Sequence, residues 1–504
     1  MSSHSSARTK RRSAQLRSSN TSAADTEFDT RYVHGLFCNR TLNLRSIQAI
    51  GYDMDYTLIH YRMSEWENRA YDHLKARLLA ANWPVEKLEF DPNLVTRGLI
   101  IDTSRGNVLK ANRFGYVKHA FHGTKPIEFE SKKRVYRDTL VDLSDRRWVF
   151  MNTLFSISEA CMYMQLVDLL DDGHVNQVRG YDELYQFVRR SLDEAHVEGQ
   201  LKRDIMSDPE RFVELDKDLA PALLDQKFAG KKLLLITNSE WSYTAPMMSF
   251  VLDSYLPDGM TWTDLFDIKI VGARKPDFFA LRMPTFEVVD EAGLLKAHVG
   301  LLESGRTYVG ANASLVEDSL DLSGDEILYV GDHIFADVNV SKSINRWRTA
   351  LIIRELEDEI RALEGFQKSE VILTDLMQRK EQIESEYSET RVRLLRARHG
   401  YGESDDTEPA IHEKQMSELR GRLVRLDEKI APLAQASARL LNPNWGPLMR
   451  TGKDKSHLAR QIERYADVYT TRVSNFLHHT PYIYLRAHRG SLPHDTIDEF
   501  GAYI

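Results

Sequence analysis

The chain has 504 residues, of which 42% are hydrophobic and 28% charged, a composition typical of a globular protein with about three domains at roughly 150 residues each. Its net charge of −8 argues against a nucleic-acid binder, whose binding surface is usually basic. The two cysteines, Cys38 and Cys161, give no disulfide framework, and no apolar run is long enough to span a bilayer. We therefore expect a cytoplasmic protein without membrane contact.

The first 27 residues form a basic segment rich in serine. No acidic residue precedes Asp25, and too few apolar side chains are present to form a core. Transit peptides have a similar charge pattern but need an amphipathic face, for which this segment offers little beyond Ala7, Ala14 and Leu16. The sequence predicts a disordered tail over residues 1–27.

Three short apolar runs each precede a polar motif. The run 46–50 comes directly before the motif 51–57, and the runs 233–236 and 327–330 are followed by polar residues in the same way. Such runs are typical of buried parallel strands. The ligands of an open α/β sheet lie beyond the carboxyl ends of its strands, so the motifs should meet in one crevice. The predicted fold class is α/β, with a doubly wound parallel-sheet core.

A long insertion, residues 58–231, separates the first two motifs. A stretch of this length cannot be a plain loop inside a compact domain. We expect it to form a cap domain that covers the crevice, excludes water and determines which substrate enters. The core domain then comprises residues 28–57 and 232–354.

The motif 51–57 contains two aspartates that suit phosphoryl chemistry. Asp53 can attack a phosphoryl group and hold it as an aspartyl phosphate. Because nucleophile and target are both anionic, a cation is needed between them, and Mg²⁺ prefers carboxylate, phosphate and water oxygens. We expect Asp53, Asp55 and Asp332 to bind this ion, with Asp53 and Asp332 as its side-chain ligands.

The remaining polar motifs supply an acid and a phosphate clamp. Asp55, two residues beyond the nucleophile, can protonate the leaving oxygen. Thr237, the backbone N–H of Asn238 and the Lys275 ammonium would stabilise charge on the phosphoryl oxygens. Asp337 is expected to hold a water molecule or Lys275 and not to bind the metal ion directly. Each motif alone has a structural interpretation, such as a helix cap, but their joint occurrence after predicted strands favours a catalytic site.

The segments after the clamp predict further elements. Residues 286–289 and the turn 290–293 indicate a β-hairpin, and residues 349–353 indicate a core strand. Over 355–442, apolar residues at three-four spacing predict an antiparallel helical hairpin with a break at 400–409, packed on itself, on the core or on another subunit. A structural arm is favoured over a regulatory coiled coil.

The last segment, residues 443–504, is rich in aromatic side chains. This composition predicts packing on the body of the protein or at a subunit interface, and with it a homo-oligomer, either a dimer or a tetramer.

The series D-x-D-x-T, T-N-S, R-K-P and G-D-H-I-F-x-D resembles that of the haloacid-dehalogenase-like phosphatases, and among them the cytosolic purine 5′-nucleotidase family. Residues 98–110, 151–155 and 464–469 also resemble that family, so the similarity extends from about Tyr32 to near the C-terminus. The resemblance implies a Mg²⁺-dependent 5′-nucleotidase acting on IMP and GMP, with possible phosphate transfer to a nucleoside acceptor.

Within the insertion, residues 189–202 resemble the family's segment that holds the purine ring and sugar. Arg189, Asp193, His196 and Lys202 fall on the matching positions. Read without the resemblance, Arg189, Asp193 and His196 have helical spacing and indicate an ordinary salt-bridged surface helix.

Two positions depart from the family. Thr124, which follows His122 and Gly123, and Val197, which follows His196, both stand where the family has aromatic residues. Aromatic stacking is a substantial part of base binding. At these two positions the sequence supplies no aromatic face for stacking on a base.

Two alternatives to a purine 5′-nucleotidase remain open. One is a phosphatase of another small phosphomonoester, and the other is a catalytically silent scaffold that acts through its helical arm. The intact Asp53, Asp55, Lys275 and Asp332 argue against a silent protein.

Overall fold

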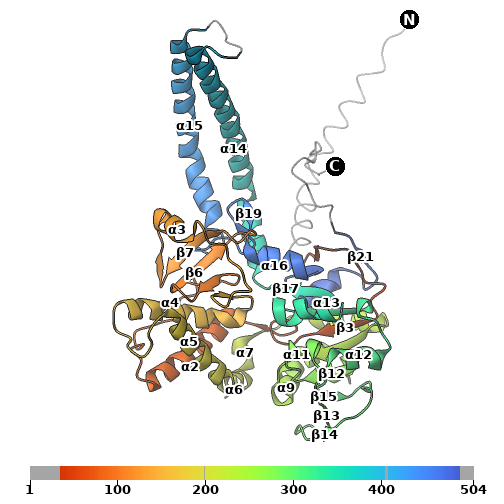
Figure 1. Cartoon of the computed structure of the whole chain (residues 1–504). Coiled ribbons are helices and arrows are strands. Elements are labelled where there is room, and N and C mark those ends of the chain that lie inside the picture. The colour runs from red at the N-terminus through yellow and green to blue at the C-terminus, as the bar shows by residue number, and fades with distance from the viewer. Residues whose placement is uncertain (1–33, 198, 403–406, 488–504) are drawn as a thin grey trace, which may run out of the picture. The chain divides into compact units, whose positions relative to one another are not determined.

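The computed structural model describes residues 34–197, 199–402 and 407–487, with only the backbone given for 193–197. The described residues form two compact units, one within 34–357 and 455–487 and the other within 358–454 (Figure 1). The predicted tail over residues 1–27 lies outside the described residues.

A ten-stranded sheet forms the core of the first unit. From β20 to β15 all neighbouring strands are parallel, and the strands at both ends are antiparallel. In spatial order the strands are β1 (Phe37–Cys38), β20 (Val468–Thr470), β17 (Arg348–Ile352), β16 (Ile327–Gly331), β3 (Ala49–Tyr52), β11 (Lys232–Ile236), β12 (Ile268–Val271), β15 (Thr307–Gly310), β13 (Thr285–Val288) and β14 (Leu295–Ala297).

The central strands β16, β3 and β11 are apolar because both faces of the sheet are covered. Every residue of β3 and β16 is buried, and in β11 only Lys232 is exposed. The helices α11 (Asp277–Ala280) and α12 (Ala313–Leu320) contribute to the buried cluster that includes these strands. The predicted α/β fold class with a parallel core sheet is confirmed.

Two strands differ at their ends from the prediction. The strand predicted at 46–50 is β3, which begins only at Ala49, because Ser46 forms a turn in which its hydroxyl donates to the Asn43 carbonyl at 2.9 Å. The strand predicted at 349–353 is β17, which begins and ends one residue earlier.

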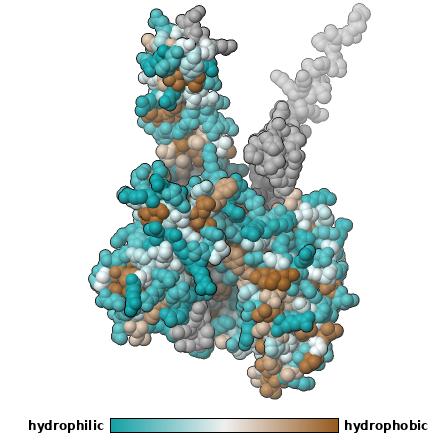
Figure 2. Space-filling model, in the orientation of Figure 1, coloured by the Kyte–Doolittle hydropathy of each residue, from teal (hydrophilic) through white to brown (hydrophobic). Residues whose placement is uncertain are grey.

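The predicted hairpin is confirmed as β13 and β14, which extend the sheet beyond β15. The Trp241 indole donates to the carbonyl of Glu291 in the hairpin turn at 3.2 Å. Figure 2 shows apolar surface at this end of the sheet, where several side chains are exposed: Phe286, Val289, Leu294, Leu295 and Val299.

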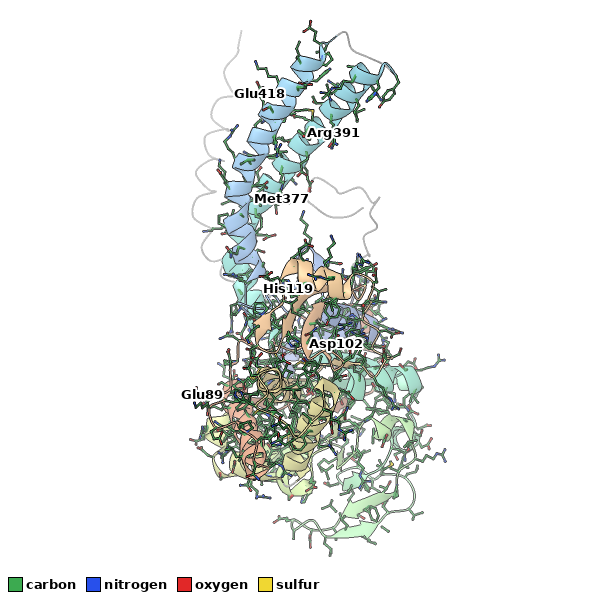
Figure 3. The ribbon with its side chains drawn as sticks, turned by 60° about the vertical axis from the view of Figure 1, so that its left-hand side comes forward. Glu89, Asp102, His119, Met377, Arg391 and Glu418 are labelled. Atoms are coloured by element: carbon green, nitrogen blue, oxygen red, sulfur yellow. The ribbon has the colours of Figure 1, made fainter. Side chains whose placement is uncertain are left out.

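The segment between β3 and β11 forms a second, antiparallel sheet and a group of helices. Figure 3 marks the region of this sheet by Asp102 and His119. The strands, in spatial order, are β8 (Lys125–Pro126), β7 (Val117–His122), β6 (Asn107–Ala111), β5 (Ile100–Asp102) and β9 (Trp148–Phe150). The helices that contact one another beside it are α2 (Met63–Ala80), α4 (Ile157–Asp171) and α5 (Tyr181–Val197).

A two-stranded ribbon joins this inserted part to the core sheet. β4 (His60–Tyr61) leads out of the core and pairs antiparallel with β10 (Val213–Glu214), which leads back. The Glu214 carboxylate accepts from Arg354 at 3.0 Å and from Arg472 at 2.7 Å. These ion pairs fasten the connecting ribbon to segments at the carboxyl ends of β17 and β20.

The second unit contains the helices α14 (Leu356–His399) and α15 (Pro409–Ala438), which lie side by side (Figures 1 and 3). Lys380, a charged residue at a predicted seam position, pairs with Asp427 of the facing helix at 2.7 Å. Leu394 and Leu419 are buried. The predicted helical hairpin is confirmed. Among the described residues, no helix has the length and apolar character needed to cross a membrane.

Candidate active site

The carboxyl ends of three adjacent strands bring the predicted motifs together. Asp53 follows β3, Thr237 follows β11 and Asp332 follows β16, and β3 pairs with both of the other strands. Lys275 lies in the loop after β12, which pairs with β11. The sequence motifs are thus gathered at one edge of the core sheet, as expected from their positions after predicted strands.

Lys275 is the centre of the ionic contacts. Its Nζ atom lies 2.7 Å from Asp53 Oδ1, 2.8 Å from Asp337 Oδ1 and 3.0 Å from the Tyr329 hydroxyl. Burial opposes the charged form of Lys275, but the carboxylates of Asp337 and Asp53 outweigh burial and raise its pKa well above the usual value. Lys275 therefore carries a fixed positive charge beside the proposed nucleophile.

Three buried carboxylates form a group that can hold a metal ion. One oxygen each of Asp53, Asp332 and Asp337 lie within 4.8 Å of one another. Asp332 Oδ2 is buried and has no hydrogen-bond partner among the described residues. Carboxylate oxygens are the preferred ligands of Mg²⁺, so this group fits the expected ion. Asp337, expected behind the ligands, has its oxygen in the same group.

The charge in this group is unbalanced. Burial raises the pKa of Asp53, Lys275 lowers it, and the neighbouring Asp337 and Asp55 raise it further. Burial and the charge of Asp337 raise the pKa of Asp332 well above its usual range, against the opposing effect of Arg97. A divalent cation between these oxygens would favour their ionised forms.

Asp55 has a different environment. The Tyr61 hydroxyl donates to Asp55 Oδ1 at 2.5 Å, and the Ser239 hydroxyl donates to Asp55 Oδ2 at 2.6 Å. Its carboxylate oxygens are outside the three-carboxylate group. The side chain expected as the general acid is thus held by two hydroxyl donors.

Asn238 braces the loop that carries Lys275. Its side-chain amide donates to the Lys275 carbonyl at 3.0 Å, and its Oδ1 accepts from the Lys275 backbone N–H at 2.6 Å. Thr237 Oγ1 accepts from the Ser239 backbone N–H at 3.0 Å. The sequence assigned only the backbone of Asn238 to the site, and these side-chain contacts add a structural role.

Arg97 is a contact that the motifs did not reveal. Its buried guanidinium donates to the carbonyl of Asp332, to the carbonyl of Asn152 at 2.9 Å, and lies 3.5 Å from Glu355. It thereby fixes the loop of a candidate metal ligand to the inserted segment. In the sequence, Arg97 was marked only by its position directly before residues 98–110, which resemble the 5′-nucleotidase family.

The four residues expected to bind the nucleoside differ in placement. Lys202, on α6 (Gln200–Ser207), donates to Ser239 Oγ at 3.0 Å and thus reaches the catalytic loop. Arg189 pairs with Glu159 at 2.9 Å. The side chains of Asp193 and His196 lie outside the described residues.

Thr124 occupies one of the positions where an aromatic residue was expected from the family pattern. Its hydroxyl donates to Asp168 Oδ2 at 2.5 Å, so this side chain ties the β7–β8 turn to α4. A built Cβ on the preceding Gly123 would lie 2.1 Å from Asp168 Oδ1, and Gly123 has a φ of +53°. The positive φ and the nearby carboxylate favour a glycine at this turn.

Comparison with known proteins is consistent with these motifs. A sequence model described as the 5′ nucleotidase family matches residues 36–497. A 5′-nucleotidase domain-containing protein of Dictyostelium discoideum is 25% identical over 472 residues, covering 91% of this chain and 74% of the relative.

Two solved structures illustrate the more distant similarities. An archaeal β-phosphoglucomutase from Pyrococcus sp. is 11% identical, with a TM-score of 0.29 over 61% of this chain and 86% of that chain. A HAD phosphatase from Thermococcus onnurineus is 14% identical, with a TM-score of 0.22 over 61% of this chain and 87% of that chain.

Because the family model matches most of its length, the chain belongs to the 5′ nucleotidase family and is a phosphoric monoester hydrolase.

Proposed function

We propose that this chain is a Mg²⁺-dependent 5′-nucleotidase that hydrolyses purine nucleoside monophosphates such as IMP and GMP through a phosphorylated Asp53. The observation that carries the proposal is the contact of Lys275 with Asp53, beside the carboxylates of Asp332 and Asp337. A buried cation and a carboxylate group suited to Mg²⁺ provide what an anionic nucleophile needs to approach a phosphate.

Asp53 is oriented for attack by its own hydrogen bonds. Its Oδ1 accepts from the Met54 backbone N–H at 2.8 Å and lies 2.7 Å from Lys275 Nζ, so both groups restrain the carboxylate. In the first step the bond from Asp53 to phosphorus forms, the bond from phosphorus to the nucleoside oxygen breaks, and Asp55 gives a proton to that oxygen.

In the second step a water molecule releases the phosphate. The Asp55 carboxylate takes a proton from the water as its oxygen bonds to phosphorus, and the bond from phosphorus to Asp53 breaks. When bound, Mg²⁺ would supply a Lewis acid for the phosphoryl oxygens, with Asp53 and Asp332 as side-chain ligands. If a nucleoside hydroxyl replaces the water, the same chemistry becomes phosphate transfer, which we also propose.

The choice of purine nucleotides rests on the inserted segment. Lys202 lies beside the catalytic loop, and Arg189, Asp193 and His196 match the family's nucleoside-binding positions. Thr124 and Val197 supply no aromatic face, so we expect base recognition to depend on polar contacts more than on stacking.

We also propose a cytoplasmic location and a homo-oligomer, either a dimer or a tetramer. Cys38 and Cys161 are both free thiols, which fits a reducing compartment. Exposed apolar side chains at the β13–β14 end of the sheet offer surface for a second copy. Sedimentation velocity would measure the mass of the assembly, and a monomer at all concentrations would contradict this part of the proposal.

The function is tested by phosphate release over a panel of nucleoside monophosphates, sugar phosphates and p-nitrophenyl phosphate, with Mg²⁺ or with excess chelator. We expect the highest kcat/KM for IMP or GMP and no turnover in chelator. Better turnover of a sugar phosphate would favour a different phosphomonoesterase. No release from any substrate, with the fold intact, would favour the scaffold alternative.

A further inference from the structure

The carboxylate of Asp55 is held at both oxygens by hydroxyl groups from different parts of the chain. Tyr61 donates to Oδ1 at 2.5 Å from the connecting ribbon, and Ser239 donates to Oδ2 at 2.6 Å from the loop after β11. Two short hydrogen bonds to opposite oxygens fix the plane of a carboxyl group that would otherwise rotate. This arrangement suits an acid that must deliver its proton in one direction.

The Tyr61 hydroxyl is itself fixed. Its oxygen lies 2.9 Å from the Tyr243 hydroxyl, and its ring lies 4.4 Å from the ring of Trp66 and 5.2 Å from that of Tyr56. The side chain is buried, with 3% of its surface exposed. Tyr61 therefore has little freedom to leave Asp55.

The support of Asp55 also depends on the inserted segment. Tyr61 lies opposite Val213 in the ribbon through which the chain enters and leaves the insertion. On the other side, Lys202 of α6 donates to the Ser239 hydroxyl at 3.0 Å and lies 4.8 Å from the Tyr243 ring centre. Both hydroxyl partners of Asp55 thus contact residues that belong to, or border, the insertion.

We propose that Tyr61 is a positioning residue for the acid-base step, which holds Asp55 in the orientation that passes a proton to the leaving oxygen. The inference rests on the proposed function, since it assigns Tyr61 a part in the same phosphoryl transfer. Tyr61 does not touch the substrate in this role. It acts only through Asp55.

The role of Tyr61 predicts a dependence on the leaving group. A nucleoside alkoxide is a poor leaving group and needs a proton during bond cleavage, whereas p-nitrophenolate leaves with little assistance. Without the hydrogen bond from Tyr61, a misoriented Asp55 should slow the phosphorylation of Asp53 by a nucleoside monophosphate more than its phosphorylation by p-nitrophenyl phosphate. A purely structural role would slow both classes alike, since it would disturb Asp53 and Lys275 as much as Asp55.

The test is Tyr61→Phe, which removes the hydroxyl and keeps the buried ring. We expect kcat/KM for the best nucleoside monophosphate to fall about tenfold to a hundredfold, the loss expected for a misdirected general acid. The value of kcat/KM for p-nitrophenyl phosphate should fall much less, because kcat/KM reports the phosphorylation of Asp53 and not the later hydrolysis that both substrates share. Tyr71→Phe is the matched control, because its hydroxyl bonds Gln165 in the insertion, and both substrates should be unaffected.

Equal losses on the two substrates, or no loss in Tyr61→Phe, would overturn the positioning role while leaving the nucleotidase itself intact. A wild-type protein without turnover on either substrate would instead overturn the proposed function. If Tyr61→Phe does not fold, Tyr243→Phe decides, since it removes the hydroxyl that contacts Tyr61. If Tyr243→Phe lowers kcat/KM for the nucleotide more than for p-nitrophenyl phosphate, the inference is supported. An equal loss on the two substrates, or no loss on either, contradicts it.

Discussion

At the scale of single residues, the site is a balance between one buried lysine and several buried carboxylates. Lys275 contacts Asp53 and Asp337, whereas Asp332 has an oxygen without a hydrogen-bond partner among the described residues. Without a bound metal ion, these carboxylates lower the free energy of unfolding, because desolvated carboxylates repel one another.

Asp332→Asn should raise the melting temperature of the metal-free protein by a few degrees. Burial and the charge of Asp337 raise the pKa of Asp332 in the folded state, so its ionised form lowers stability at neutral pH. The amide removes that charge and also weakens Mg²⁺ binding. Differential scanning fluorimetry with and without Mg²⁺ measures both effects. A lower melting temperature of the metal-free variant would contradict the predicted repulsion between the carboxylates. Stabilisation by Mg²⁺ equal to that of the wild type would contradict the metal site.

Lys275→Met should have the opposite effect on the metal-free protein. It leaves the carboxylates of Asp53 and Asp337 buried without their cation, which typically costs about 3–5 kcal/mol. Urea unfolding would measure the loss, and Lys275→Arg, which keeps the charge, is the control. An unchanged free energy of unfolding in Lys275→Met would show that the ion pairs contribute nothing to stability.

The sequence identified the candidate catalytic residues of the polar motifs but missed the residues that support them. Asp53, Lys275 and Asp332 could be found because each belongs to a short motif with known chemistry. Arg97 reaches the Asp332 carbonyl across 235 positions of the chain, and Tyr61 reaches Asp55 by an aromatic side chain that reads as ordinary core. Contacts of this kind depend on tertiary packing, which leaves no local pattern.

At the scale of elements, the long or strongly periodic segments were predicted and the shortest strands were not. The helices α14 and α15 and the hairpin β13–β14 agree with the apolar spacing and the turn. The connecting ribbon has two residues in each strand, too few for any alternation to be seen. β20 joins the core sheet beside β17, from a segment expected to pack on the body of the protein or at a subunit interface.

Helix α2 carries a buried carboxyl whose titration should be measurable. Glu67 accepts from the Ser158 backbone N–H at 2.8 Å, and burial raises the pKa of Glu67 to about 8. The folded-state pKa lies above the unfolded value of about 4.3, so the protonated form is favoured by folding and stability falls as the pH rises through this window.

Glu67→Gln should therefore flatten the pH dependence of stability. Its free energy of unfolding should fall less than that of the wild type between pH 5 and pH 8, by about 1.4 kcal/mol for each pKa unit of the shift. Urea unfolding at several pH values measures this, with the more exposed Glu65→Gln as the control. Parallel pH profiles for wild type and Glu67→Gln would show that Glu67 is not titrating in the folded protein.

At the scale of the whole molecule, the catalytic motifs all lie in one compact unit and the helical hairpin in the other. Shortening both helices beyond the Lys380–Asp427 pair should leave phosphatase activity with Mg²⁺ intact, because no candidate catalytic residue is removed. Specificity constants and sedimentation velocity would be measured together. If the shortened protein keeps its fold but loses activity, this result would contradict the prediction and assign the arm a direct part in catalysis.

The central claim is that Asp53 carries the phosphoryl group. The direct measurement is a rapid acid quench during turnover of IMP or GMP with Mg²⁺, followed by mass spectrometry of the peptide that contains Asp53. The proposed function predicts one added phosphoryl group on Asp53, which is absent in a folded Asp53→Asn variant that has lost nearly all turnover. A wild-type enzyme that turns over rapidly without this modification, or an Asp53→Asn variant that keeps substantial activity, would contradict it.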